Sequence, residues 1–215
     1  MDIMEEQDWL SKAHRDMSLG RHQDALSSYE KALEMNPENG HSWEMMGDIY
    51  YELGRHVEAI ACYDRALEID PGNLMAGYKK GYAFRKVKRY EEAIAALDQA
   101  LAIDPDFSYA LNNKGYSLNE LGRYEEAIAY FDRSLSMNPR NIRVIASKGI
   151  ALRELGRYEE ALKCFDRALE LNAINGFVYY NKSITLQSMG RGKEADTCLS
   201  RINFPSSVHH DGKED

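Results

Sequence analysis

The segment GRYEEAIAYFDRSLSMNP at residues 122–139 is followed, 34 residues later, by GRYEEALKCFDRALELNA at residues 156–173. Both begin with Gly-Arg-Tyr-Glu-Glu-Ala, and a variant of this phrase stands at 88–93. The same interval separates four prolines, each of which follows an Asn or Asp: Pro37, Pro71, Pro105 and Pro139. Self-similarity at a fixed period of this length predicts a repeat protein.

The repeat divides almost the whole chain into units of equal length. Six units are predicted: 6–39, 40–73, 74–107, 108–141, 142–175 and 176–209. The last is degenerate and is expected to cap the array, which we place at 1–204. Residues 205–215 are polar, lack a helical pattern and are predicted to be a disordered tail.

Each unit carries two stripes of apolar residues spaced three and four apart, which is the period of an α-helix. In the fourth unit Leu111, Leu118 and Leu121 mark the first helix, and Ala127 and Phe131 mark the second. A glycine, which ends a helix at little steric cost, follows the first helix in most units: Gly20, Gly54, Gly122, Gly156 and Gly190. Lys88 replaces it in the third unit, where the most strained turn is expected. The pattern predicts an all-α fold of helical hairpins.

Two further positions have predicted structural roles. Glycine at the eighth position is expected to face the small residue at the twentieth, as Gly47 would face Ala59, so that the two helices approach closely. Asparagine before the first helix is well suited to cap it, at Asn39, Asn73, Asn141 and Asn175.

These residues resemble the tetratricopeptide repeat, whose pattern appears in the second unit as Trp43, Gly47, Tyr50, Ala59, Tyr63, Ala66 and Pro71. The resemblance implies an α-α superhelix, a right-handed solenoid of stacked hairpins in which the first helices line a concave groove. It also implies that the chain binds another protein or a peptide. The chain departs from the family pattern at Lys80, Lys114, Lys148, Lys182 and Ala173.

Composition argues against several other classes of protein. The net charge of −8 and a pI near 5.3 do not favour nucleic acid as a partner, because phosphate binding needs a basic surface. The first ten residues carry four acids and no apolar run, and no stretch approaches the length of a membrane span. We therefore expect a cytoplasmic protein without a membrane partner.

No set of residues has the pattern of a catalytic or metal site. The six histidines lack metal-ligand spacing, and Cys62, Cys164 and Cys198 share one repeat position where a packing role is expected. Paired glutamates such as Glu91 and Glu92 open the second helices, where carboxylates favour the positive end of the helix dipole. We predict no enzymatic activity and no cofactor.

The resemblance places the binding surface on the first helices of units three to five, with a contribution from unit six. The candidate peptide-binding residues are Tyr78, Lys79, Tyr82, Arg85, Tyr109, Asn112, Asn113, Tyr116, Arg143, Ser147 and Asn181. Tyrosines give large contact areas, and the amides and hydroxyl at Asn113, Ser147 and Asn181 can bond a peptide backbone. Because cations outnumber anions here, an acidic partner segment is predicted.

Other interpretations of the same residues stay open. The tyrosines can also serve only to pack neighbouring helices together. The chain can be a self-associating structural protein, forming a homo-oligomer, or the accessory interaction subunit of an enzyme complex whose catalytic chain is separate.

Overall fold

The computed structural model describes residues 5–202, which form twelve α-helices. The chain divides into two compact units, Met1–Leu121 and Gly122–Asp215, which are described one at a time. The division falls at the turn inside the fourth predicted repeat. The predicted tail at 205–215 lies outside the described residues.

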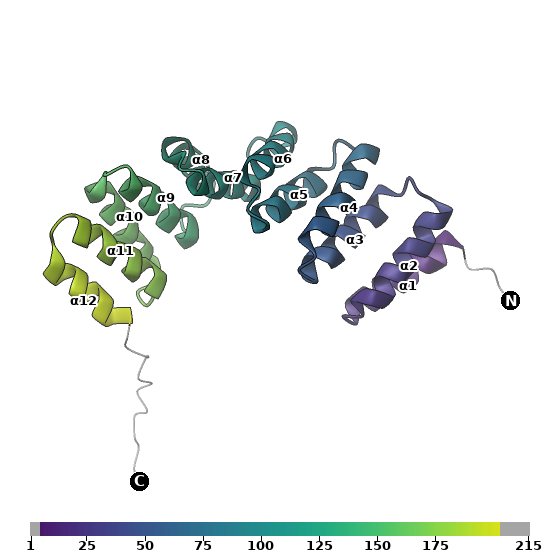
Figure 1. The fold of residues 1–215 in the computed structure, drawn as a ribbon, viewed down its shortest axis with the longest axis horizontal. Helices are drawn as coiled ribbons and strands as arrows, with labels where there is room; N and C mark the ends of the chain where they lie inside the picture. The colour runs from purple at the N-terminus through teal and green to yellow at the C-terminus, as the bar shows by residue number, and fades with distance from the viewer. Residues whose placement is uncertain (1–4, 203–215) are drawn as a thin grey trace, which may run out of the picture. The chain divides into compact units, whose positions relative to one another are not determined.

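The first unit contains seven helices in its described part. They are α1 (Glu6–Ser18), α2 (His22–Met35), α3 (Gly40–Glu52), α4 (His56–Ile69), α5 (Leu74–Lys86), α6 (Tyr90–Ile103) and α7 (Ser108–Glu120). The pairs α1/α2, α3/α4 and α5/α6 form antiparallel hairpins that follow one another side by side, and α7 lies against α6 (Figure 1). Helices α3, α5 and α7 are therefore the first helices of successive repeats.

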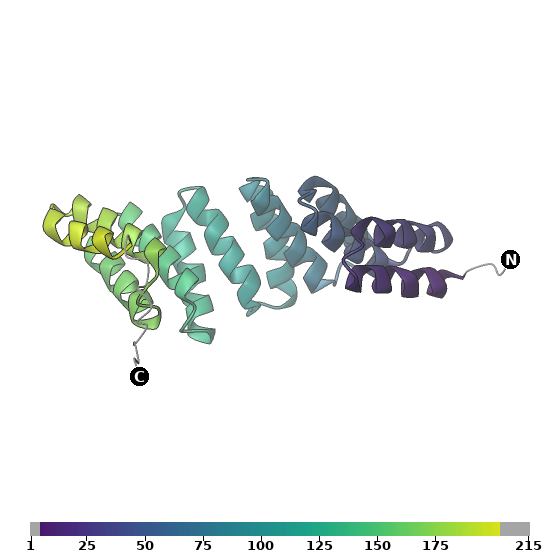
Figure 2. The same cartoon turned by 90° about the horizontal axis from the view of Figure 1, so that it is seen from below.

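The second unit contains five helices in its described part. They are α8 (Tyr124–Met137), α9 (Ile142–Glu154), α10 (Tyr158–Leu171), α11 (Gly176–Ser188) and α12 (Gly192–Ile202). Within this unit α9/α10 and α11/α12 form hairpins, and α8 lies against α9 (Figure 2). Each predicted repeat thus contains its two helices, and those of the fourth repeat, α7 and α8, belong to different units.

The turns between paired helices use the left-handed backbone conformation, as predicted. The five turn glycines have φ between +69° and +74°: Gly20, Gly54, Gly122, Gly156 and Gly190. Lys88 occupies the same place at φ +61° and is the non-glycine residue with positive φ in the described chain. Its side chain makes this conformation costly, which confirms the strained turn expected there.

Asparagine caps begin four of the first helices. The side chain of Asn39 accepts a hydrogen bond from the Ser42 backbone N–H at 3.0 Å. Equivalent bonds at Asn73, Asn141 and Asn175 confirm the predicted caps.

Glycine at the eighth repeat position permits close helix approach, against a large side chain that the sequence did not identify. A Cβ on Gly47 would lie 2.5 Å from Cε1 of Tyr63, which is itself 1% exposed. On Gly149 it would lie 2.8 Å from Cε1 of Phe165. The glycine therefore makes room for the large buried side chain sixteen residues later. At Gly81 a Cβ would also lie 3.1 Å from the carbonyl oxygen of Ala93, the small residue twelve positions later that was predicted to face it.

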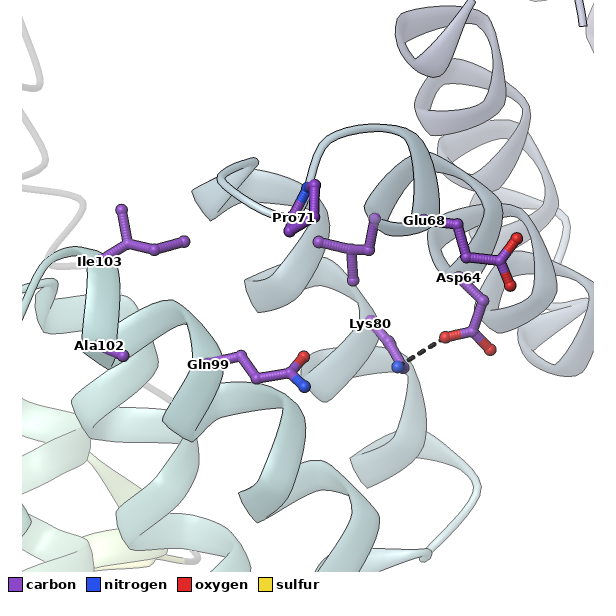
Figure 3. A pocket seen from close by; sticks show the side chains of 8 residues that line it. Asp64, Glu68, Pro71, Lys80, Gln99, Ala102 and Ile103 are labelled. Atoms are coloured by element: carbon purple, nitrogen blue, oxygen red, sulfur yellow. Dashed lines mark ion pairs between the residues drawn. The ribbon is translucent and has the colours of Figure 1, made fainter. Parts of the chain in front are cut away.

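The lysines that depart from the family pattern have a repeated structural role. The ammonium of Lys80 on α5 lies 2.6 Å from a carboxylate oxygen of Asp64 on α4, in the preceding repeat (Figure 3). The same pairing joins Lys114 to Asp98, Lys148 to Asp132 and Lys182 to Asp166. An ion pair between consecutive repeats thus stands at the position where the family pattern has an apolar residue.

Candidate functional site

A row of tyrosine rings crosses the first helices of three successive repeats in the first unit. The ring centroids of Tyr51 on α3 and Tyr82 on α5 lie 5.3 Å apart. Tyr78 on α5 lies 6.1 Å from Tyr82 and 5.9 Å from Tyr109 on α7. We call Tyr51, Tyr82, Tyr78 and Tyr109 the tyrosine row. Phe107 supports it by packing edge-on against Tyr78 at 5.3 Å.

Arg85 lies between two aromatic rings beside this row. Its guanidinium carbon is 5.0 Å from the ring centroid of Tyr82 and 5.7 Å from that of Tyr116. The ammonium of Lys86 also lies 5.4 Å from the Tyr82 ring. Cations stacked on aromatic faces in this way are held in place without a carboxylate partner.

Asn113 fixes the position of Arg85. It is 6% exposed; its Oδ1 accepts a hydrogen bond from Arg85 Nε at 3.0 Å, and its Nδ2 donates to the Tyr109 carbonyl at 2.8 Å. Each end of the amide is therefore engaged in one hydrogen bond within the protein. Neighbouring Asn112 is half-buried, and its Oδ1 is enclosed without a hydrogen-bond partner.

Lys79, a predicted groove cation, is neutralised by two acids of the preceding repeat. Its Nζ lies 2.6 Å from Glu44 and 2.6 Å from Asp48, both on α3. Asn73 donates to Glu44 at 2.9 Å, and the Tyr63 hydroxyl donates to Asp48 at 2.8 Å. The expected excess of positive charge is therefore carried in this unit by Arg85 and Lys86.

Ionisation of this network and of the tyrosines follows from their surroundings. Burial opposes charge on Glu44, but hydrogen bonds from Lys79 and Asn73 lower its pKa. Burial raises the pKa of Tyr78, as do its neighbours in the row, and burial together with a hydrogen bond to Tyr82 raises that of Tyr51. These phenols stay neutral near pH 7 and offer polar hydroxyls on an aromatic surface.

The remaining candidate residues belong to the second unit. Arg143 is exposed and Ser147 half-buried, both on α9. Asn181 on α11 is 5% exposed, and its hydrogen bonds match those of Asn113. Its side-chain oxygen accepts a hydrogen bond from Arg153, and its side-chain nitrogen donates one to the Phe177 carbonyl. Its amide is likewise engaged.

Tyr51 and Phe107 are part of the aromatic surface and were missed in the sequence. Tyr51 stands at the twelfth position of its repeat, which is also the position of Arg85, so that reading the twelfth position in every unit would have found it. Phe107 precedes α7 as its N-cap residue, and no helical pattern marks it.

Two cavities lie away from the candidate residues. One of about 540 Å³ lies among α4, α5 and α6 and includes the Lys80–Asp64 pair, with Leu67, Gln99 and Ile103 in its walls (Figure 3). Another of about 390 Å³ lies in the second unit beside Lys182 and Asp166. Within residues 5–202 no group of three potential ligands could hold a metal ion. None of the helices in that range is long and apolar enough to cross a membrane.

Family comparisons confirm the resemblance seen in the sequence. One model described as the tetratricopeptide repeat matches residues 10–73 and 78–142, and another matches residues 143–173. Together these matches cover well over half of the chain. A search of the curated proteins gives no significant match.

Solved structures share the fold. A crystal structure of MamA protein is 26% identical with a TM-score of 0.75, covering 78% of this chain and 92% of that chain. A tetratricopeptide repeat protein from Parabacteroides merdae is 20% identical with a TM-score of 0.82, covering 92% and 78%. YrrB, titled a TPR protein with an unusual peptide-binding site, is 24% identical with a TM-score of 0.69, covering 81% and 90%. At 20% and 24% identity, the similarities to the Parabacteroides merdae protein and to YrrB show the fold alone. The predicted fold class, an all-α protein of the α-α superhelix type, is confirmed.

Proposed function

Because the chain belongs to the tetratricopeptide repeat family, whose members generally bind other proteins or peptides, we propose that it binds a segment of a partner protein on the tyrosine row and Arg85. Family members are typically scaffolds without catalytic activity. The partner segment would lie across α3, α5 and α7.

The stacking of Arg85 between Tyr82 and Tyr116 is the observation that carries this proposal. Tyrosine and arginine are enriched among the residues that dominate binding energy at interfaces. A side chain already held by Asn113 loses little conformational entropy when a ligand arrives. The surface is therefore preorganised for binding.

Charge favours an acidic ligand segment. Lys86 is exposed and forms no ion pair with any residue between 5 and 202. A carboxylate of the partner could reach this ammonium while apolar parts of the segment cover the rings. Tyr109, 61% exposed, offers the most accessible ring of the row.

Site-specific photo-crosslinking in the native source tests the proposal. A photoreactive phenylalanine analogue is placed at Tyr109 and, as a control, at the exposed Gln99 on α6. We expect a discrete crosslinked partner from position 109 and none of the same mass from position 99. The crosslink should weaken when Tyr82→Ala and Arg85→Ala are added, because both change the surface beside Tyr109.

Crosslinking of the same partner from position 99 alone would place binding on the second helices of the repeats and overturn the proposal. A crosslink from position 109 to a second copy of this chain would favour self-association instead.

A further inference from the structure

A long side chain of the following repeat bonds the carbonyl of the proline that ends a repeat. At the junction between repeats one and two, Trp43 Nε1 donates to the Pro37 carbonyl at 3.0 Å. At the junction between repeats four and five, Arg167 Nη2 donates to the Pro139 carbonyl at 2.6 Å. Trp43 stands at the fourth position of its repeat and Arg167 at the twenty-sixth. These side chains therefore cover the proline loop at both junctions.

The junction between repeats two and three lacks both of these side chains. Gly77 stands at the fourth position of the third repeat and Gln99 at the twenty-sixth. The Gln99 amide is directed toward Lys80 (Figure 3). Among residues 5–202 no donor bonds the Pro71 carbonyl. The cavity of about 540 Å³ lies at this junction, with Pro71 and Gln99 in its walls. The place that Arg167 fills in the second unit is thus open here.

Charge differs between these two junctions in step with the arginine. Glu68 lies in the cavity wall, and Asp70 directly precedes Pro71. Three acids at this junction have neutral counterparts at the junction that contains Arg167: Glu68, Asp70 and Asp104 correspond to Ser136, Asn138 and Asn172. The junction that supplies its own guanidinium is therefore neutral at these positions, and the one that lacks it is acidic. This difference favours a cationic occupant of the cavity.

The carboxylates in the cavity can accept a further hydrogen bond. Asp64 Oδ1 lies 2.6 Å from the Lys80 ammonium, and Glu68 Oε2 pairs with Arg65 on the same helix. Each of these ion pairs uses one carboxylate oxygen, whereas an ionised carboxylate accepts at both. The Glu68 pair is exposed on both sides and contributes little by itself. Because Asp64 neutralises Lys80, that ammonium does not oppose a second cation.

From these observations we infer that this cavity binds an arginine side chain of a partner protein, which supplies the guanidinium that the junction lacks. The guanidinium donates to the Pro71 carbonyl and to Glu68. The aliphatic stem covers Leu67 and Ile103, which also line the cavity. The walls come mainly from the second helices α4 and α6, so this site goes beyond the proposed function and does not require that the tyrosine row bind anything.

A displayed library of random peptides, selected on the full chain and counter-selected on Gln99→Arg, provides the probe. The introduced arginine should reach Pro71 as Arg167 reaches Pro139, and it then fills the cavity from within. We expect the selected peptides to share an arginine. Calorimetric titration of one synthetic peptide should show affinity about tenfold or more lower for Gln99→Arg. Replacing the peptide's arginine with uncharged citrulline should cost a similar factor.

Matched variants test the charge and separate this cavity from the tyrosine row. Glu68→Gln should weaken the same peptide about threefold, as for an exposed charge pair, and added salt should reproduce part of that loss. Glu34→Gln changes the equivalent position of the first repeat and should leave affinity unchanged. Tyr82→Ala should also bind the peptide as wild type does, so that failure at one surface is distinguishable from failure at the other. Melting temperatures verify that each variant is folded.

Three results would overturn the inference. Selection could yield no peptide that distinguishes the wild type from Gln99→Arg. The peptides that do distinguish them could lack arginine, or bind equally well with citrulline in its place. Sedimentation could show a dimer of this chain that Gln99→Arg dissociates, in which case a second copy occupies the cavity.

Discussion

Asn113 on α7 joins the first helices of two successive repeats, because its Oδ1 accepts a hydrogen bond from Arg85 Nε of α5 while its Nδ2 donates to the Tyr109 carbonyl. A buried amide thereby fixes an arginine that lies on two aromatic rings. Binding at the tyrosine row is expected to depend on this amide even though a ligand would scarcely touch it.

Replacing Asn113 with Ala should weaken partner binding by about 1–2 kcal/mol, since Arg85 loses its hydrogen bond and must be ordered by the ligand. Stability should fall by about 1 kcal/mol. Calorimetric titration and urea unfolding measure the two effects. Asn181→Ala is the matched control, because it removes the same bonds in the second unit and should leave binding at the tyrosine row unchanged.

Gly47 should tolerate no side chain. Gly47→Ala would bring a Cβ to 2.5 Å from Tyr63, whose ring is enclosed, and is expected to destabilise the fold by about 1–3 kcal/mol. Gly192→Ala is the control, because a Cβ there meets nothing within 4 Å; it should be neutral or stabilise by up to about 1 kcal/mol. Equal urea midpoints for the two variants would contradict this explanation of the glycine.

Lys88 offers a stabilising substitution. Lys88→Gly should raise the free energy of unfolding by about 1 kcal/mol, because glycine adopts φ +61° without the steric cost of a Cβ. The same change at Lys163, exposed within α10, should instead cost about 1 kcal/mol through lost helix propensity. Chemical denaturation of both variants tests the sign at each position.

Acid should weaken the network of Glu44 and Lys79. The folded-state pKa of Glu44 lies below its usual value of 4.5, so its contribution to stability is present above pH 4.5 and is lost as pH falls through the folded pKa. Glu44→Gln should remove part of the decline in stability as the pH falls below 4.5. Glu34→Gln, in an exposed pair with Lys31, should leave the decline largely intact. Parallel pH profiles for wild type and Glu44→Gln would contradict this account.

Much of the fold could be predicted because its determinants are local. The turn at Lys88 and the cap at Asn39 each depend on the chain within a few residues, and both are as expected. The contact of Gly47 with Tyr63 was missed because helix approach depends on a side chain from the opposite helix, and spacing alone did not identify which one. The Lys80–Asp64 pair was missed because it joins different repeats.

The candidate site was harder to predict because exposure and pairing are properties of three-dimensional neighbours. Repeat position correctly placed Tyr78, Tyr82 and Tyr109 on adjacent helices, but it could not show that Lys79 is neutralised by α3. Nor could it show that Asn113 is buried beneath Arg85.

The most direct test of the central claim is the affinity of the chain for the partner that crosslinks from position 109. Calorimetric titration measures this affinity for wild type, Tyr82→Ala and Gln99→Ala. The account predicts that Tyr82→Ala weakens binding by about 1–3 kcal/mol, the range for losing an aromatic anchor, with little change in melting temperature. Gln99→Ala, exposed on α6, should bind as wild type. Wild-type affinity for Tyr82→Ala together with lost binding for Gln99→Ala would contradict the account and move the functional surface to the second helices.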